Sequence, residues 1–250
     1  MQTNLQPISA PHIRISIKIV STLNKSYHTN QPPLEGKIKR LVLTQEGRTK
    51  LNIYPDREFY AFPRFVKHVD DGFISTLTNL YRERLRPDME ILDLMSSWIS
   101  HLPSDVNYKK VVGHGLNAQE LAKNPRLDFF VVKDLNKDQE FEFESFSFDA
   151  VLCIVSVQYL QQPEKSGGVF IVSFSNRMFY EKAISAWSEG TAYSRVQLVV
   201  QYFQSVEGFT EPQENMSPIG WIMRLFGLIS GLDPFYAVIA YRSFKHILDA

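Results

Sequence analysis

Short apolar runs recur through the middle of the chain, and each has the length of a buried strand. They occupy residues 90–94, 110–113, 128–132 and 150–155. The last run is apolar on both faces, as strands of a covered parallel sheet are. Strands that alternate with helical segments and turns predict the α/β class.

Helical spacing of apolar positions appears between these strands. After Pro63, apolar residues recur at this spacing and predict an amphipathic helix that ends in basic residues before Pro87: Val66, Val69, Phe73, Leu77, Leu80, Tyr81 and Leu85. Asn117 to Glu120 has the form of a capping box, which predicts a helix that stops before Pro125.

The last third of the chain predicts further elements. Residues 181–187 and 194–204 favour helices of a cap on the substrate side. Residues 219–229 predict a core helix or, alternatively, an interfacial helix. Residues 236–241 predict a final strand at an edge or in a hairpin.

The loop at residues 95–101 follows the first strand and is the first place to expect chemistry, because ligands of open α/β sheets bind beyond the carboxyl ends of strands. Met95, Ser97 and Ile99 stand where a dinucleotide site needs glycines. The loop therefore argues against a nicotinamide or flavin dinucleotide and favours a ligand without phosphates, recognised through Asp93 and hydroxyl or backbone groups. Alternatively, Asp93 and the serines only satisfy the loop backbone.

A second candidate region lies before the long helix, where aromatic residues stand beside arginines and His68 is followed by two acids. Such a group could cover a ligand or hold a general base. Alternatively, Asp70 or Asp71 is a helix N-terminal acid and His68 is a surface residue.

Composition limits the choice of partners. The 250 residues fit one α/β domain with additions. Lys and Arg number 27, as do Asp and Glu, so no global field favours nucleic acid or an anionic membrane. The single cysteine, Cys153, predicts a small buried core residue and excludes an internal disulfide or a cysteine-based metal cluster. We expect no metal site and no integral membrane span.

The N-terminus has a different composition. Residues 1–34 contain three bases and no acid, which is typical of an organelle transit peptide or, alternatively, of a disordered tail. Residues 35–52 favour a hairpin or an extended arm. We therefore expect an N-terminal extension over 1–52 and a folded domain over 53–250, with a chloroplast location or otherwise a cytoplasmic one.

Residues 54–241 together resemble the class I S-adenosylmethionine-dependent methyltransferases, and within them a type-11-like subgroup of plants and cyanobacteria. The residues that carry the resemblance are FPRFVKHVDDGF (62–73), EILDLMSSWISHLP (90–103), VVGHGLNAQELAKNPRLDFFVVKDLN (111–136), SFDAVLCIVSVQYLQQPEK (147–165) and GGVFIVSFSNRMF (167–179). The resemblance implies a Rossmann-like, seven-stranded, mostly parallel sheet flanked by helices. It also implies S-adenosyl-L-methionine as cofactor, bound across the ends of strands one to four.

The resemblance also implies roles for particular residues. The acid that usually binds the ribose falls at Gly115, so His114 or Asn117 would have to substitute. The implied cofactor contacts are Asp93, Met95, Ser96, Ser97, His114, Gly115, Asn117, Asp134, Leu135 and Ser156. The substrate side would be formed by Tyr60, Arg64, Gln158 and Tyr159, and the candidate bases are His68 and His101.

One departure from the family concerns folding. Family members place a helix and a Leu-Lys-Pro turn before the pair Gly167-Gly168, whereas here Lys165 runs almost directly into it. The crossover helix therefore looks deleted, which predicts an uncovered apolar sheet face and lower stability.

Two functions follow. The first is methyl transfer to a small molecule, which depends mainly on positioning and needs no fixed set of catalytic residues. The second is a non-catalytic binding or scaffold protein that has kept the fold, and the missing glycines favour it. A serine hydrolase is excluded because Ser96 and Ser97 lack the Gly-x-Ser-x-Gly turn.

Overall fold

The structure, a computed structural model, describes residues 42–143, 147–162, 170–206, 208–216 and 233–241. Its helical elements are η1 (Glu46–Arg48), α1 (Asp56–Phe59), α2 (Asp71–Arg84), α3 (Ala118–Lys123), η2 (Val157–Tyr159), η4 (Tyr180–Lys182), α4 (Ser185–Ser188) and α5 (Ala192–Gln204). Its strands are β1 (Glu90–Leu94), β2 (Lys110–Gly115), β3 (Phe129–Val132), β4 (Ala150–Ile154), β5 (Phe170–Phe174), β6 (Gln213–Met216) and β7 (Tyr236–Ala240).

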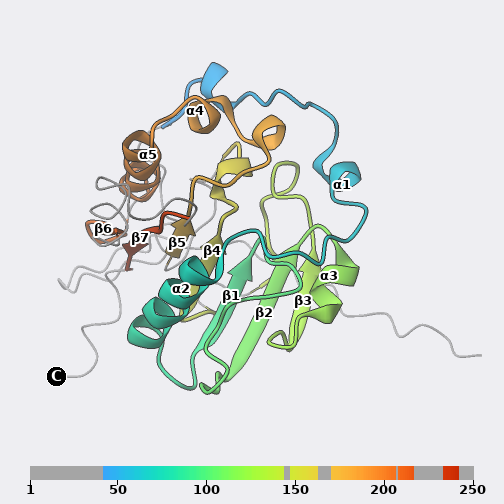
Figure 1. Ribbon diagram of the computed structural model, residues 1–250, viewed down its shortest axis with the longest axis vertical. Helices are drawn as coiled ribbons and strands as arrows, with labels where there is room; N and C mark the ends of the chain where they lie inside the picture. The colour runs from blue at the N-terminus through green and yellow to red at the C-terminus, as the bar shows by residue number, and fades with distance from the viewer. Residues whose placement is uncertain (1–41, 144–146, 163–169, 207, 217–232, 242–250) are drawn as a thin grey trace, which may run out of the picture.

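The strands form one seven-stranded sheet in the order β3-β2-β1-β4-β5-β7-β6 (Figure 1). The strands from β1 to β5 pair in parallel, and β7 pairs antiparallel with both β5 and β6. The protein therefore has a Rossmann-like α/β fold with a mostly parallel sheet, as the sequence predicts. The order reverses between β1 and β4, and ligands of open α/β sheets bind at such a reversal.

Each face of the sheet carries its own apolar core. Helix α2 covers one face, where Phe73 and Leu77 pack with Ile91 of β1 and Leu152 of β4. Helix α5, with the segment around Trp187, covers the other face. Cys153 is free and buried, as predicted, and the described side chains of β4 and β5 are almost all buried. The uncovered apolar face expected from a missing crossover helix is therefore not seen at these residues.

Helix α2 begins later than its apolar spacing suggests. Asp70 is the N-cap, and its carboxylate accepts a hydrogen bond from the Phe73 N–H at 2.7 Å. The backbone N–H of Asp70 is held by Asp233. Residues 63–69 are therefore not helical, and Val66 is exposed. The reading of Asp70 as a helix N-terminal acid is confirmed.

The C-terminal predictions are partly corrected. The helix expected over 181–187 is two single turns, η4 and α4, whereas α5 matches the second prediction closely. Strand β7 was expected at an edge or in a hairpin. It is not at the edge, because β6 pairs antiparallel with its outer side. The sequence of β6 is too polar to be recognised as a strand. Residues 219–229 lie outside the described residues.

The described part of the N-terminal arm packs against the domain and is not a hairpin. Residues Glu46–Arg48 form a short 3-10 helix, and Lys50 forms an isolated antiparallel bridge with Ile184. The Asn52 N–H donates to the Glu181 carbonyl at 2.9 Å. Residues 1–41 lie outside the described residues, so the transit peptide stays a prediction.

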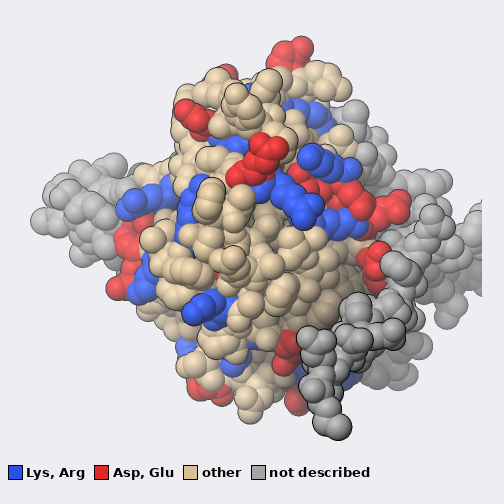
Figure 2. Space-filling model, turned by 90° about the vertical axis from the view of Figure 1, so that its right-hand side faces the viewer, with Lys and Arg blue, Asp and Glu red and all other residues tan. Residues whose placement is uncertain are grey.

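One face of the molecule shows no concentration of charge of a single sign (Figure 2). Figure 2 shows the side of the molecule that carries α1 and α3, where acidic and basic side chains lie next to one another. This agrees with the equal numbers of acids and bases in the sequence. No helix in the described ranges is long and apolar enough to cross a membrane.

Candidate functional site

A cavity of about 340 Å³ lies at the carboxyl ends of the central strands. Residues that follow β1, β2, β3 and β4 form its floor, and residues 177–179 after β5 add to its wall. The segment between α1 and α2 crosses over these strand ends (Figure 1), and its residues 66–69 line the mouth. The size and position are those of a small-molecule site.

Most residues singled out from the sequence meet in this cavity. Those that line it are Tyr60, Arg64, His68, Asp93, Met95, Ser96, Ser97, His101, His114, Gly115, Asn117, Asp134, Leu135, Ser156 and Tyr159. Gln158 does not line it, which contradicts its expected place on the substrate side. The 3-10 turn Val157–Tyr159 directs this side chain inward, where it is 0% exposed and donates to the Val155 carbonyl at 2.9 Å.

Asp93 is the buried acid of the floor. It is 1% exposed, and its Oδ2 accepts a hydrogen bond from the Ser96 hydroxyl at 2.7 Å. Its Oδ1 is buried without a hydrogen-bond partner. Burial raises the pKa of this carboxyl to about 7, against the opposing effects of the Ser96 and Ser100 hydroxyls. Asp93 therefore offers one unused acceptor whose charge changes near neutral pH.

The residues that leave β1 and β4 have strained backbones. Met95 has φ 55° and Val155 has φ 48°, and both line the cavity. A left-handed conformation is uncommon for residues other than glycine, and most of all for a β-branched residue such as valine. Strain of this kind gathers at ligand sites. Met95 thus takes, without glycine, a conformation that a glycine would adopt easily.

His114 joins three strand ends through its ring. The Lys133 carbonyl can only accept, so Nε2 is the protonated nitrogen and donates to it at 2.8 Å. Nδ1 accepts the Met95 N–H at 3.2 Å. Burial lowers the pKa of the ring to about 4, which keeps it neutral. Both ring nitrogens are already used, so His114 has no free group for a ribose hydroxyl.

Asn117 is equally occupied. Its Oδ1 accepts the N–H groups of Gln119 and Glu120 and so caps α3, while its Nδ2 donates to the carbonyls of Tyr60 and Ala61. These four hydrogen bonds are all that an asparagine side chain can make. Asn117 anchors the segment that crosses the cavity, and it has no hydrogen-bonding group left to replace a ribose-binding acid.

Gly115 is a glycine for a steric reason. A Cβ atom at this position would lie 2.6 Å from the Ser96 carbonyl oxygen, which is far too close. The Ser96 N–H also donates to the His114 carbonyl at 2.6 Å, so the loop after β1 lies directly on the end of β2. That loop fills the space that a side chain at 115 would need.

Glu120 is the residue that the sequence analysis did not recognise. It was interpreted as the acid of a capping box, but its Oε1 accepts the Arg64 N–H at 2.6 Å. The side chain is 8% exposed and lines the cavity in the first turn of α3. A buried acid beyond β2 is thus present after all, five residues later in the chain than Gly115. The capping pattern concealed it, because Glu at that position already has a structural explanation.

Asp134 and Leu135 follow β3 and face the same cavity. Asp134 Oδ1 accepts the Asn136 N–H at 3.0 Å, which shapes the loop. Leu135 is buried in the core beneath it. The carboxylates of Asp93 and Asp134 therefore line one cavity from the ends of different strands.

His68 and His101 lie at the mouth of the cavity, and the pKa of each is lowered. Burial lowers the pKa of His101 to about 4, with Lys67 and His68 adding to the effect. Burial, with a smaller contribution from Arg64, also lowers the pKa of His68, whose ring contacts the Phe179 ring edge-on at 5.7 Å between centroids. His68 is the better placed of the two, because the atoms around it that lower its pKa shield it only in part, and its side chain still reaches solvent at the mouth.

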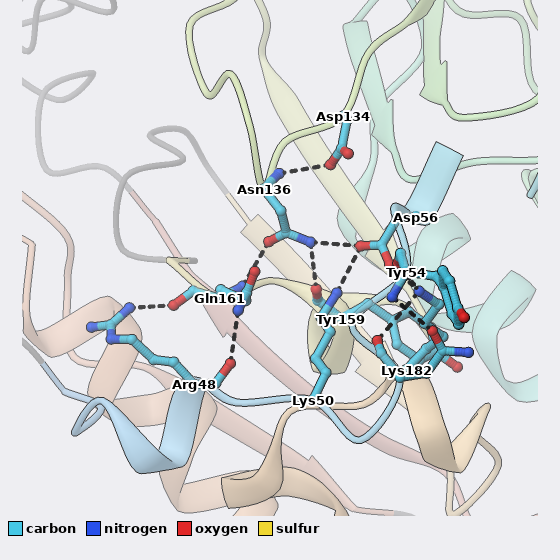
Figure 3. A network of polar contacts seen from close by, with 10 residues as sticks. Arg48, Lys50, Tyr54, Asp56, Asp134, Asn136, Tyr159, Gln161 and Lys182 are labelled. Carbon is cyan, nitrogen blue, oxygen red and sulfur yellow. Dashed lines mark hydrogen bonds and ion pairs between the residues drawn. The ribbon is translucent and has the colours of Figure 1, made fainter. Parts of the chain in front are cut away.

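A polar network supports one wall of the cavity (Figure 3). The Asp56 carboxylate accepts from Lys50 at 2.7 Å, from Lys182 at 3.0 Å and from Asn136 at 3.0 Å. Lys182 is 0% exposed and also donates to the Tyr54 carbonyl at 2.5 Å. Asn136 continues to Gln161, which bonds to Arg48 in both directions. The network ties the N-terminal arm to the loops after β3 and β4.

Comparisons with known proteins describe the fold only. No protein-family model and no curated protein matches this sequence. Among solved structures, a methyltransferase from Mesorhizobium loti is 16% identical over 66% of this chain and 96% of its own, with a TM-score of 0.41. Magnesium protoporphyrin IX methyltransferase from Synechocystis is 11% identical over 75% and 94%, with a TM-score of 0.44. Phosphoethanolamine N-methyltransferase 2 from Haemonchus contortus is 14% identical over 70% of this chain and 53% of its own, with a TM-score of 0.44.

Proposed function

We propose that this protein binds S-adenosylmethionine and transfers its methyl group to a small molecule. The observation that carries the proposal is that Asp93 and Asp134, from the ends of two parallel strands, line one cavity at the point where the strand order reverses. The cofactor would supply an activated methyl group on a sulfonium, and the protein's contribution would be position and exclusion of water.

An unused buried group supports the fit of the cofactor. Asp93 Oδ1 accepts no hydrogen bond in the structure, although the Ser100 hydroxyl lies close enough to lower the pKa of the carboxyl, and a buried acceptor without a hydrogen bond is costly. The ammonium of the cofactor's methionine part would satisfy it, with the loop of Met95, Ser96 and Ser97 alongside. Because that contact needs an ionised carboxyl, affinity would rise as pH increases through about 7, the pKa of Asp93.

The adenosyl part would lie over the ends of β2 and β3. Asp134 would accept the adenine amino group, with the Leu135 N–H beside it, and Ser156 would close the side next to β4. We propose Glu120 as the ribose contact, because His114 and Asn117 are fully hydrogen-bonded. Its Oε1 is fixed by the Arg64 N–H, which orients the carboxylate in the cavity wall.

The acceptor would enter beside the aromatic residues. Tyr60 and Tyr159 line this end of the cavity with Arg64. We propose His68 as the base for acceptors that must lose a proton, since His101 is too weak a base at neutral pH. Oxygen or nitrogen acceptors that are already nucleophilic would need no base.

Titration calorimetry with S-adenosylhomocysteine tests the proposal. We expect binding to the wild type, and a loss of roughly tenfold to a hundredfold in affinity for Asp134→Ala, since one charge-assisted hydrogen bond disappears. Asp138→Ala is the matched control, because Asp138 is an exposed acid of the same loop that pairs with Lys133 at 2.8 Å. The absence of heat with millimolar ligand would reject the proposal.

A non-catalytic binding or scaffold protein is the second candidate. It is favoured by the connection between β1 and β2, residues 95–109, which contains neither a helix nor a glycine. The loop instead lies on Gly115 and against His114. Calorimetry separates the candidates, because a protein without cofactor binding would give no heat with S-adenosylhomocysteine.

The finer assignments are proposals as well. We propose a plant or cyanobacterial type of methyltransferase with one crossover helix deleted, and an N-terminal extension over residues 1–52 whose first 34 residues are a plastid transit peptide. The composition of residues 1–34, with three bases and no acid, supports the extension. A fluorescent protein fused to residues 1–34 would be imported by isolated chloroplasts, and retention outside them would contradict the proposal.

A further inference from the structure

Arg64 holds an unusual place in the cavity wall. Its guanidinium lies over the rings of Phe59, Tyr60 and Phe179, with 4.5, 5.4 and 5.3 Å from Cζ to the ring centroids. Nη2 donates to the Phe59 carbonyl at 2.9 Å, which fixes the plane of the group. Arginine stacked and anchored in this way is oriented before any ligand arrives.

One side of this guanidinium is unsatisfied. Arg64 Nη1 is buried and has no hydrogen-bond partner. The nearest acid by contact, Glu120, accepts from the Arg64 backbone and leaves the guanidinium without a carboxylate. A buried charged donor without a partner calls for an explanation, and a ligand anion is one that the cavity can provide.

The other cations that line the cavity are already paired. Lys67 pairs with Asp71 at 2.6 Å and Lys133 with Asp138 at 2.8 Å. Arg177 pairs with Asp233 at 2.7 Å. Within the described part of the chain, Arg64 is thus the cavity cation without a carboxylate partner. A single free guanidinium suits a monoanion, whereas a phosphate dianion would demand more positive charge.

Aromatic rings line the cavity next to Arg64. The ring of Phe179 meets that of Tyr60 edge-on, with 6.1 Å between centroids, and is tilted by 32° from that of Tyr159, with 6.2 Å between centroids. All three residues line the cavity. Aromatic walls favour a flat, conjugated body that offers its face or edge to the rings.

Taking the proposed methyl transfer as given, we propose that the acceptor is a flat aromatic or conjugated molecule that carries one carboxylate, and that Arg64 binds this carboxylate through Nη1. Arg64 therefore determines which molecules the protein binds as methyl acceptors. The carboxylate fixes the orientation of the acceptor, and the rings hold its body.

Calorimetry on the full chain tests this with a matched pair of probes, 2-naphthoate and its neutral analogue 2-naphthamide. We expect naphthoate to bind the wild type at least about tenfold more tightly than naphthamide, as a charge-assisted hydrogen bond implies. Equal affinities, or no naphthoate binding at millimolar concentration, would overturn the proposal. This comparison needs no variant and so does not depend on how a variant folds.

Variants assign the effect to Arg64. Arg64→Gln is expected to weaken naphthoate binding roughly tenfold to a hundredfold and leave naphthamide binding unchanged, with Arg64→Lys between the two. Arg57→Gln is the control, since Arg57 is an exposed arginine of α1 that does not line the cavity. Naphthoate binding that survives in Arg64→Gln would overturn the assignment.

The carboxylate of the cofactor's methionine part is the competing occupant. We expect naphthoate to bind equally well to protein saturated with S-adenosylhomocysteine, and S-adenosylhomocysteine to bind Arg64→Gln as it binds the wild type. If Arg64→Gln weakens S-adenosylhomocysteine but not 5′-methylthioadenosine, which lacks the carboxylate, Arg64 serves the cofactor and the acceptor proposal fails. If S-adenosylhomocysteine does not bind at all, methyl transfer fails, and the naphthoate result still decides the anion site.

Discussion

Two pairs of residues line the same cavity, but they differ in how much of their hydrogen-bonding capacity the fold has used. His114, near the end of β2, and Asn117, the N-cap of α3, have every side-chain donor and acceptor engaged with the main chain. Asp93 Oδ1 and Arg64 Nη1 are buried with none. Saturated side chains hold the wall in place, and unsaturated ones are what the wall offers to a ligand.

In the polar network around Asp56, the fold also uses the carboxylate fully. Removing this carboxylate should have the largest effect on stability. Asp56→Ala would leave Lys50 and Lys182 buried without their shared carboxylate, which should cost about 3–5 kcal/mol of unfolding free energy. Urea denaturation measures it. Asp105→Ala is the control, because Asp105 pairs with Arg82 on the surface and should cost at most about 1 kcal/mol. Equal losses in the two variants would contradict a special role for the network.

Asp93 should behave in the opposite way, because a buried carboxyl with an unused oxygen destabilises the fold when it ionises. Its pKa is about 7 when folded, well above the ordinary value of an aspartate, so the folded state binds more protons than the unfolded state between those two values. Its contribution to stability is therefore lost as pH rises from about 4 through about 7.

Asp93→Asn should accordingly stabilise the protein at pH 8, by at most about 4 kcal/mol, and change little near pH 4. It should also abolish the rise of S-adenosylhomocysteine affinity with pH. Denaturation across this pH range, with calorimetry at the same points, measures both effects. A gain in stability that is the same at every pH would show that ionisation of Asp93 is not its cause.

Gly115 tests whether the loop after β1 really occupies the place of a ribose-binding acid. Gly115→Ala should cost about 1–3 kcal/mol, because the added Cβ would meet the Ser96 carbonyl oxygen. Gly47→Ala is the control: its Cβ would make only ordinary contacts at 3.4 Å, and the change should stay within about 0.5 kcal/mol. If Gly115→Ala were as stable as the wild type, the loop would have room to move and an acid could be restored there.

Replacing Asn117 should have the smallest effect on stability. It also tests directly whether a side chain with all its hydrogen bonds used can contribute to ligand binding. Asn117→Ala removes the cap of α3 and the anchor of Tyr60 and Ala61, at a cost of about 1–2 kcal/mol. Its effect on S-adenosylhomocysteine affinity should be small once the protein is folded, because the side chain has no free group for the ligand. Asn107→Ala, at an exposed position, is the control for stability. A large loss of affinity would mean that Asn117 contacts the cofactor after all.

Several elements could be predicted from the sequence because their signals are local. The four apolar runs became β1 to β4, and Asn117 caps α3 as its pattern indicates. Apolar spacing alone would begin α2 too early, because it extends upstream of Asp70, whereas Asp70 caps the helix and is held by Asp233. The interpretation of Asp70 as a helix N-terminal acid gave the correct start. The short polar strand β6 has no such spacing, and its pairing with β7 alone makes it a strand.

The sequence by itself determined the α/β class, the order of the central strands along the chain and the loop ends at which a site should form, since burial on two faces leaves a periodic signature. Only the tertiary structure decided which polar side chains of the cavity have a hydrogen-bonding group left for a ligand. Saturation of His114, the late-placed acid Glu120 and the unpaired Nη1 of Arg64 all depend on partners distant in the chain. Such contacts carry no local pattern, because hydrogen bonds are set by where the packed backbone brings donors and acceptors together.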